Sequence, residues 1–146
     1  MAYEQLKLEN QLCFPVYAAS RLITREYQPF LDRLEITYPQ YLVLMVLWEN
    51  NSLPVNDIAK KLILNTNTIT PLLKRMEQQG LINRSRSEKD ERKVLVQLTE
   101  KGKNLQETAS EIPEELVKRL SDSKLKLEDL ITLKENLNSI ISFLSK

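Results

Sequence analysis

The chain is poor in cysteine and histidine, the two residue types that supply thiol nucleophiles, the commonest general base and the commonest transition-metal ligands. Its 146 residues include one cysteine, Cys13, and no histidine. One cysteine permits neither an intrachain disulfide nor a multi-thiolate metal site, and without histidine the chain lacks the commonest general base and transition-metal ligand. We therefore predict no metal, no cofactor and no enzymatic activity. Cys13 itself is either a small hydrophobic side chain or a reactive thiol.

A second set of side chains suits a polyanionic partner. Residues 54–98 carry nine basic and five acidic side chains, a net charge of +4, whereas the rest of the chain carries −3. Helical spacing over residues 66–79 places polar and basic side chains opposite an apolar face formed by Ile69, Leu72, Leu73 and Met76. Such a polar face is either a solvated surface or an interface for nucleic acid. As DNA contacts we predict Thr66, Asn67, Thr68, Thr70, Lys74, Arg75, Arg86, Lys89, Asp90 and Arg92.

The elements that position these residues follow from hydrophobic periodicity and from helix caps. We predict a long first helix over residues 8–34, which Pro15 forces either to begin close to Cys13 or to bend there. Thr37 caps the next helix, residues 50–52 form a turn, and Gly80 ends the helix over residues 66–79. Alternating residues predict two strands, 81–86 and 93–98, joined by a charged tip. Thr99 then caps a helix toward Leu120 that Pro113 interrupts, and residues 127–144 form a last amphipathic helix.

This order of elements is that of a winged helix-turn-helix protein. The predicted fold class is mostly α with a small β-hairpin wing. We predict a single domain over residues 1–146, with a DNA-binding module at about 38–98 and dimerisation helices at about 6–34 and 99–146. The apolar stripe along residues 127–144 is wide for a lone terminal helix and indicates a partner surface.

The runs PVNDIAKKL, TITPLLKRMEQQGLINR and DERKVLVQLTEKG resemble the helix-turn-helix and the wing of MarR-family transcription regulators. The resemblance covers essentially the whole chain. It implies a homodimer whose terminal helices interlock and whose two winged modules read a pseudo-palindromic duplex DNA operator. It also implies that Arg92 enters the minor groove and that Asp90 helps to hold the wing.

The N-terminal run KLENQLCFPVYAASRLITREYQPFLDRLEITYPQYLVL resembles the organic-hydroperoxide-sensing OhrR subgroup of that family, with its relatives SarZ and MgrA. The resemblance implies that Cys13 senses the oxidant and that Tyr17, Tyr27 and Tyr38 are the matching tyrosines; Pro15 departs from the pattern. An organic hydroperoxide would convert the thiolate to a sulfenic acid. Since the chain has no second cysteine, an external low-molecular-weight thiol would then form a mixed disulfide, and DNA would be released.

Helix geometry limits which tyrosines can meet Cys13. Tyr17 lies one turn away, whereas Tyr27 is fourteen residues on, or about 21 Å along a continuous helix at ~1.5 Å per residue. Along a continuous helix Tyr27 cannot reach its own Cys13, but it could reach the cysteine of a partner subunit if the two first helices pack antiparallel, which would place the sensor at the dimer interface.

Other functions stay open. A small aromatic ligand rather than an oxidant could release the DNA, with Cys13 structural; the chain could be a helical protein-interaction adaptor that binds through residues 127–144; or it could be a one-cysteine peroxidase. The N-terminus lacks the pattern of a signal peptide, and the longest apolar run, residues 41–48, is shorter than a membrane span. We predict a cytoplasmic location.

Overall fold

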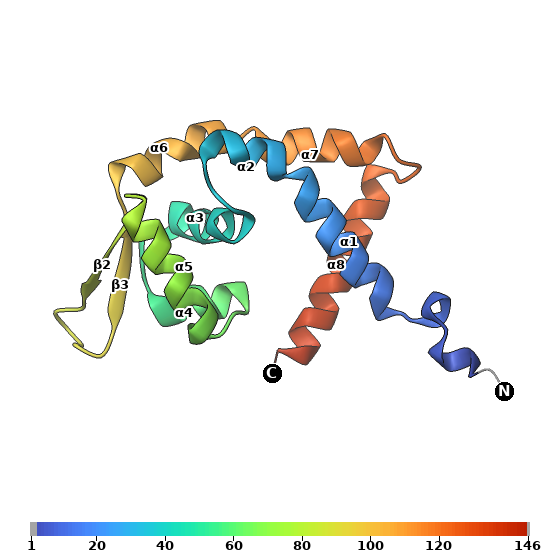
Figure 1. Ribbon diagram of the computed structural model, residues 1–146, viewed down its shortest axis with the longest axis horizontal. Coiled ribbons are helices and arrows are strands. Elements are labelled where there is room, and N and C mark those ends of the chain that lie inside the picture. The colour runs from blue at the N-terminus through green and yellow to red at the C-terminus, as the bar shows by residue number, and fades with distance from the viewer. Residues whose placement is uncertain (1–2, 146) are drawn as a thin grey trace.

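The computed structural model describes residues 3–145, so the domain predicted over 1–146 includes residues 1–2 and 146, which lie outside the described residues. Within this range the chain is mostly helical, with one small sheet (Figure 1). The elements are two 3-10 turns, Glu4–Leu6 and Leu8–Asn10, the helices α1 (Cys13–Glu26), α2 (Gln28–Leu34), α3 (Tyr38–Asn50), α4 (Val55–Leu62), α5 (Thr66–Gln78), α6 (Glu100–Ala109), α7 (Ile112–Ser121) and α8 (Leu127–Leu144), and the strands β1 (Ser52–Pro54), β2 (Ile82–Arg86) and β3 (Val94–Leu98).

The long first helix predicted over residues 8–34 is divided. Of the two alternatives for Pro15, the structure has the helix begin at Cys13, so that the proline falls in its first turn, where its missing N–H forfeits little. A second break at Tyr27 was not predicted. It separates α1 from α2 because Pro29 cannot donate to the carbonyl of Arg25 and suits the start of a new helix.

The predicted caps and the predicted hairpin of the winged module are confirmed. Thr37 and Gln40 form a capping box at the start of α3, and Gly80 ends α5 with a φ of 76°. Strands β2 and β3 pair antiparallel. The turn predicted at residues 50–52 is wrong for Ser52, which begins a third strand, Ser52–Pro54. This strand pairs with the other edge of β3, so that the strand order is β1-β3-β2.

The hydrophobic core belongs to the winged module and to the helices that cover it. Its buried residues come mainly from α2 to α7 and from strands β2 and β3, and α3 lies at its centre with Val43, Leu44 and Leu47 fully buried. Figure 1 shows α1 and α8 extending away from this module. Neither helix contributes a buried residue. We call α1 and α8 the arms.

The arms nevertheless carry many large apolar side chains. The exposed ones in α1 and just before it are Leu6, Leu8, Leu12, Phe14, Val16, Tyr17 and Leu22, and those in α8 include Leu127, Ile131, Leu133, Ile140, Ile141 and Leu144. Scattered apolar residues are normal on a surface, but two helices with so many mark an interaction surface. Within residues 3–145 no helix has both the length and the apolar character that crossing a membrane requires.

Candidate nucleic-acid interface and thiol site

Helix α5 presents one face to the core and the other to solvent. Ile69, Leu72, Leu73 and Met76 are buried, which fixes the rotation of the helix about its axis. As a consequence, all six predicted DNA contacts on this helix are exposed: Thr66, Asn67, Thr68, Thr70, Lys74 and Arg75. Of these, Thr68 already has a structural role, because its backbone N–H and its hydroxyl both donate to the Asn65 cap, at 2.9 and 3.1 Å.

The tip of the wing is held by its own polar groups. Asp90 Oδ1 accepts from the backbone N–H of Arg92 at 3.1 Å and lies 3.4 Å from its Nε. Arg86 Nη1 donates to the carbonyl of Glu91 at 2.8 Å, so this arginine supports the tip from within. The Arg92 side chain is 92% exposed although it pairs with Asp90, and Lys89 is also exposed, so both cations can contact a polyanion.

Helix α5, which we call the recognition helix because it carries most of the predicted DNA contacts, meets the wing in one concave surface. A hollow between α5, the start of α4 and the wing is lined by Asp57, Thr66, Thr70, Arg92 and Lys93 among others. The structure therefore brings three of the predicted contact residues, Thr66, Thr70 and Arg92, to the same place.

An ion pair that the sequence did not reveal joins the helix to the wing. Glu77, in the last turns of α5, accepts from the backbone N–H of Arg84 at 3.0 Å and from its Nη2 at 3.1 Å. The side-chain hydrogen bond from Arg84, followed by its backbone hydrogen bond, lowers the pKa of Glu77. One hint of this pair was present in the sequence, since Glu77 is the single acidic residue of a helix whose other charged residues are basic. Because both residues are tied to regular elements, the pair holds the angle between α5 and β2.

Cys13 is the first residue of α1, which extends away from the winged module (Figure 1). Its thiol is free and exposed. Tyr17, one turn on, is exposed as well and stacks under the guanidinium of Arg21, 4.6 Å from the ring centroid. Across residues 3–145, no cluster of histidine, cysteine, aspartate and glutamate is arranged to hold a metal ion.

Tyr27 and Tyr38 belong to an aromatic cluster of their own chain, away from its Cys13. Their ring centroids are 5.0 Å apart, and both contact Tyr41, at 5.9 and 6.3 Å. Burial, and then the neighbouring Tyr38 and Tyr41, raise the pKa of Tyr27 to about 12, and burial also raises the pKa of Tyr38 and Tyr41. The hydroxyls therefore stay protonated at neutral pH and can donate hydrogen bonds. The sequence analysis missed Tyr41, although its i,i+3 spacing from Tyr38 placed it on the same face of α3.

The cluster continues to the junction between α3 and α6. Tyr41 meets the ring of Trp48 edge-on, with centroids 6.3 Å apart, and Trp48 Nε1 donates to the carbonyl of Gly102 at 3.0 Å. Gly102 packs directly against the backbone of Leu81, which follows the recognition helix. Packed side chains thus connect the tyrosines to the C-terminal end of α5.

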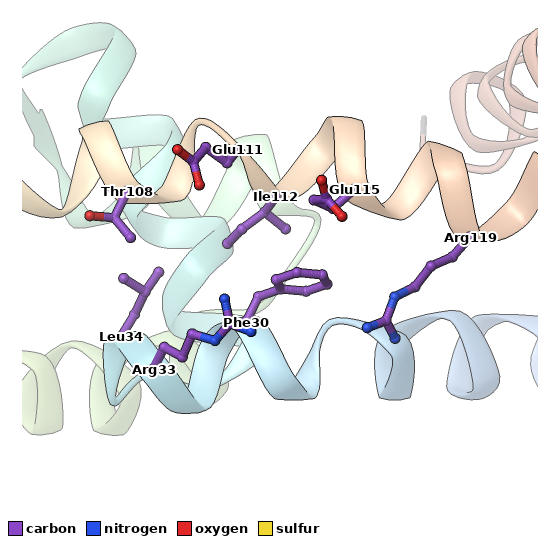
Figure 2. A pocket seen from close by; sticks show the side chains of 8 residues that line it. All are labelled: Phe30, Arg33, Leu34, Thr108, Glu111, Ile112, Glu115 and Arg119. Atoms are coloured by element: carbon purple, nitrogen blue, oxygen red, sulfur yellow. The ribbon is translucent and has the colours of Figure 1, made fainter.

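A second hollow, of about 280 Å³, lies between α2 and the α6–α7 segment (Figure 2). Phe30 projects into it, with the guanidinium carbons of Arg33 and Arg119 at 5.8 and 5.1 Å from its ring centroid. Arg119 also pairs with Glu26 of α1 at 3.0 Å. The carboxylates of Glu111 and Glu115 line the same hollow, so its charges are balanced.

Comparison with known proteins gives consistent results. Residues 25–108 match the protein family described as Transcriptional regulator SarA/Rot. The chain is 52% identical over 142 residues to the organic hydroperoxide resistance transcriptional regulator of Bacillus subtilis (strain 168), covering 97% of this chain and 95% of that protein. It is 38% identical over 128 residues to the HTH-type transcriptional regulator MgrA of Staphylococcus aureus, covering 87% of each.

Among solved structures, the chain is similar to AbfR, a protein of Staphylococcus epidermidis, in its reduced form bound to DNA. The TM-score is 0.79 at 38% identity, and the match covers 98% of both chains. AbfR has also been solved in an overoxidised form bound to DNA and in a form with a disulfide.

Proposed function

Because the chain belongs to the MarR/SarA family of winged helix-turn-helix transcription regulators, we propose that it binds a pseudo-palindromic operator as a homodimer and leaves it when Cys13 is oxidised. The chain is a DNA-binding regulator and not an enzyme. The observation that carries the redox part of the proposal is the exposed thiol of Cys13, at the start of an arm whose apolar side chains are uncovered. A cytoplasmic location goes with this role, since the protein must reach the DNA that it regulates.

The proposed DNA interface combines the exposed face of α5 with the wing. Asn67, Thr70, Lys74 and Arg75 would face the major groove, whose width of ~12 Å admits a helix. Arg92, held by Asp90, would enter the neighbouring minor groove. The hollow between α5 and the wing supports this assignment, because it gives a phosphate backbone a place between the two reading elements.

The proposed homodimer would form through the arms. Burying the apolar side chains of α1 and α8 against those of a second copy stabilises the assembly by the same hydrophobic effect that closes a core. Cys13 lies about 21 Å along α1 from Tyr27 of its own chain, at ~1.5 Å per residue. If the two α1 helices pack antiparallel, each Cys13 approaches the protonated hydroxyls of Tyr27 and Tyr38 of the partner subunit.

The proposed chemistry has two steps. The Cys13 thiolate attacks the terminal oxygen of an organic hydroperoxide, the O–O bond breaks, and the sulfur becomes a sulfenic acid while the peroxide leaves as an alcohol after taking up a proton. A low-molecular-weight thiol then attacks the sulfenic sulfur and expels water, which leaves a mixed disulfide. The added bulk at the arm would favour a dimer geometry that fits the operator poorly.

Fluorescence anisotropy with a duplex of the promoter region tests the proposal. Wild type should bind when reduced and dissociate after cumene hydroperoxide and a low-molecular-weight thiol, and intact mass should show one adduct per chain. Cys13→Ser should bind equally well and stay bound. Ser20→Ala, which changes another small exposed side chain of α1 and leaves the thiol in place, is the matched control and should keep the mass adduct and the release from DNA. Retention of both wild type and Cys13→Ser on DNA after oxidation would refute the redox switch and leave the DNA-binding role standing.

A small aromatic carboxylate is a second candidate signal. The hollow at Phe30, flanked by Arg33 and Arg119, favours it, whereas Glu111 and Glu115 in the same hollow would repel the anion. We therefore rank it below oxidation. Release of Cys13→Ser from DNA by benzoate, with no effect of hydroperoxide on wild type, would reverse this order.

A further inference from the structure

The recognition helix contains a proline where helices rarely tolerate one. Five of the six prolines in the chain lie outside helix interiors: Pro15, Pro29, Pro39 and Pro113 in first turns, and Pro54 in a strand. Pro71 alone lies inside a helix, as the sixth residue of α5. Proline has no backbone N–H, so the carbonyl of Asn67, four residues earlier, cannot form its helical hydrogen bond.

This carbonyl lies on the face of α5 that points away from the core. Asn67, Thr70, Pro71 and Lys74 are all exposed, whereas Ile69 and the other apolar residues of α5 are buried. Within residues 3–145 no side chain donates to the Asn67 carbonyl, and the nearby hydroxyl of Thr68 donates to the Asn65 side chain instead. A proline inside a helix also tilts the bypassed carbonyl outward, so the oxygen is open to an external donor.

Most of the charged chemistry around this oxygen is that of donors. Lys74 and Arg75 are cations that suit phosphates and the acceptor atoms of guanine and thymine, whereas the Thr70 hydroxyl and the Asn67 amide can donate or accept. In the major groove, cytosine N4 and adenine N6 are donors, and reading them requires an acceptor.

We propose that the Asn67 carbonyl, released by Pro71, accepts a hydrogen bond from the exocyclic amino group of a cytosine or adenine in the major groove. The inference rests on the proposed DNA-binding function and adds one base-reading atom to it. A substitution at position 71 decides whether this acceptor is available. A residue with a backbone N–H there would donate to the Asn67 carbonyl and leave the Asn67 side chain unchanged.

The probe is a duplex that the wild-type protein selects from a randomised pool. In one half-site each adenine is replaced in turn by purine deoxyriboside and each cytosine by 2-pyrimidinone deoxyriboside, which removes only the exocyclic amine. For wild type we expect one such replacement to weaken binding about three- to tenfold, as for the loss of one neutral hydrogen bond. Whether the sensitive position is adenine or cytosine identifies the base.

The decisive variant is Pro71→Ala. It should melt at a higher temperature than wild type because the helical bond is restored, yet bind the selected duplex about three- to tenfold more weakly and lose its sensitivity to the amine at that position. Pro113→Ala, which changes a proline in a first turn, is the matched control and should leave affinity unchanged. Pro71→Gln restores the same N–H should the alanine variant fold poorly.

Two results would overturn the inference: a Pro71→Ala protein that binds as tightly as wild type, or one that keeps the full penalty for the missing amine. Failure of the wild type to select any duplex is a different result. It would refute the proposed function itself, and this inference with it.

Discussion

Replacing Gly102 by alanine should damage the junction between α6 and the winged module. A methyl group at this position would overlap the carbonyl oxygen of Leu81 and lie 3.0 Å from Cδ2 of Leu98. Neither neighbour can yield easily, because the Leu81 carbonyl accepts from the backbone N–H of Thr99 at 3.1 Å and Leu98 is buried. Helix α6 must therefore move away from the module, which also strains the hydrogen bond between Trp48 Nε1 and the Gly102 carbonyl.

The size of the effect follows from three contributions. Overpacking a close contact costs about 1–3 kcal/mol, and loss of a neutral hydrogen bond adds about 1 kcal/mol. The better helix propensity of alanine returns about 1 kcal/mol. Because the clash involves a backbone carbonyl, we expect a net loss of about 2–3 kcal/mol in the free energy of unfolding, a large share of the ~5–15 kcal/mol typical of a folded domain.

The other glycine in the chain provides a matched control. Gly80 has a φ of 76° and open space where a Cβ would be, so Gly80→Ala should lose only about 1 kcal/mol, through backbone strain. Urea unfolding of both variants, at the same protein concentration, can be followed by the fluorescence of Trp48, the one tryptophan. The native spectrum should change in Gly102→Ala and not in Gly80→Ala. Equal destabilisation of the two variants, or an unchanged native spectrum in Gly102→Ala, would refute this account of the junction.

Three further predictions concern the ionisable groups. Glu77→Gln should lower both the free energy of unfolding and the affinity for DNA. Because Arg84 lowers the pKa of Glu77, the stability that the pair contributes is present above the ordinary value of 4.5 and is lost as the pH falls below it. The unfolding free energies of wild type and variant, measured in urea, should therefore converge in acid. Because the pKa of Tyr27 is raised from 10.0 to about 12, the unfolded state loses this proton first, and wild-type stability should fall between these pH values, more steeply than in Tyr27→Phe. Arg92→Ala should reduce the slope of log affinity against log salt by about 0.9, because one cation fewer displaces counterions from the DNA, whereas Asp90→Ala should weaken binding with little change of slope.

Much of the fold could be predicted because hydrophobic periodicity and caps are local properties. Thr37, Asn65 and Thr99 each cap a helix through a bond within three residues, which a single sequence can reveal. Strand β1 could not be found in this way. It has three residues, one of them a proline, and it exists because β3 returns to pair with it, which is a long-range contact. The break at Tyr27 was accessible, since Pro29 signals it, but the apolar stripe continued past it and hid it.

In the candidate site, too, the local features could be predicted from the sequence and the long-range contacts could not. Exposure of Lys74 and Arg75 follows from the helical period, so the sequence was sufficient for it. The partners of Arg86 and Arg84 depend on how the wing folds back, at distances of a few ångströms that no spacing rule supplies. Arg86 supports the wing tip and Arg84 braces α5, whereas the sequence analysis predicted Arg86 as a DNA contact and counted Arg84 only as positive charge.

The division between core and arms bears directly on how a signal at Cys13 could reach the DNA. The thiol lies on an arm that contributes nothing to the core, whereas Tyr27 and Tyr38 pack against Tyr41 inside the winged module and, through Trp48 and Gly102, against the end of α5. A weakly supported helix can shift without unfolding the module, and a well-packed module moves as one body. In the proposed dimer, a covalent change where the arm of one protomer meets the tyrosines of its partner would therefore reorient the two DNA-binding modules without unfolding them. This geometry predicts that oxidation changes the spacing between the two modules while the unfolding transition of each stays nearly the same.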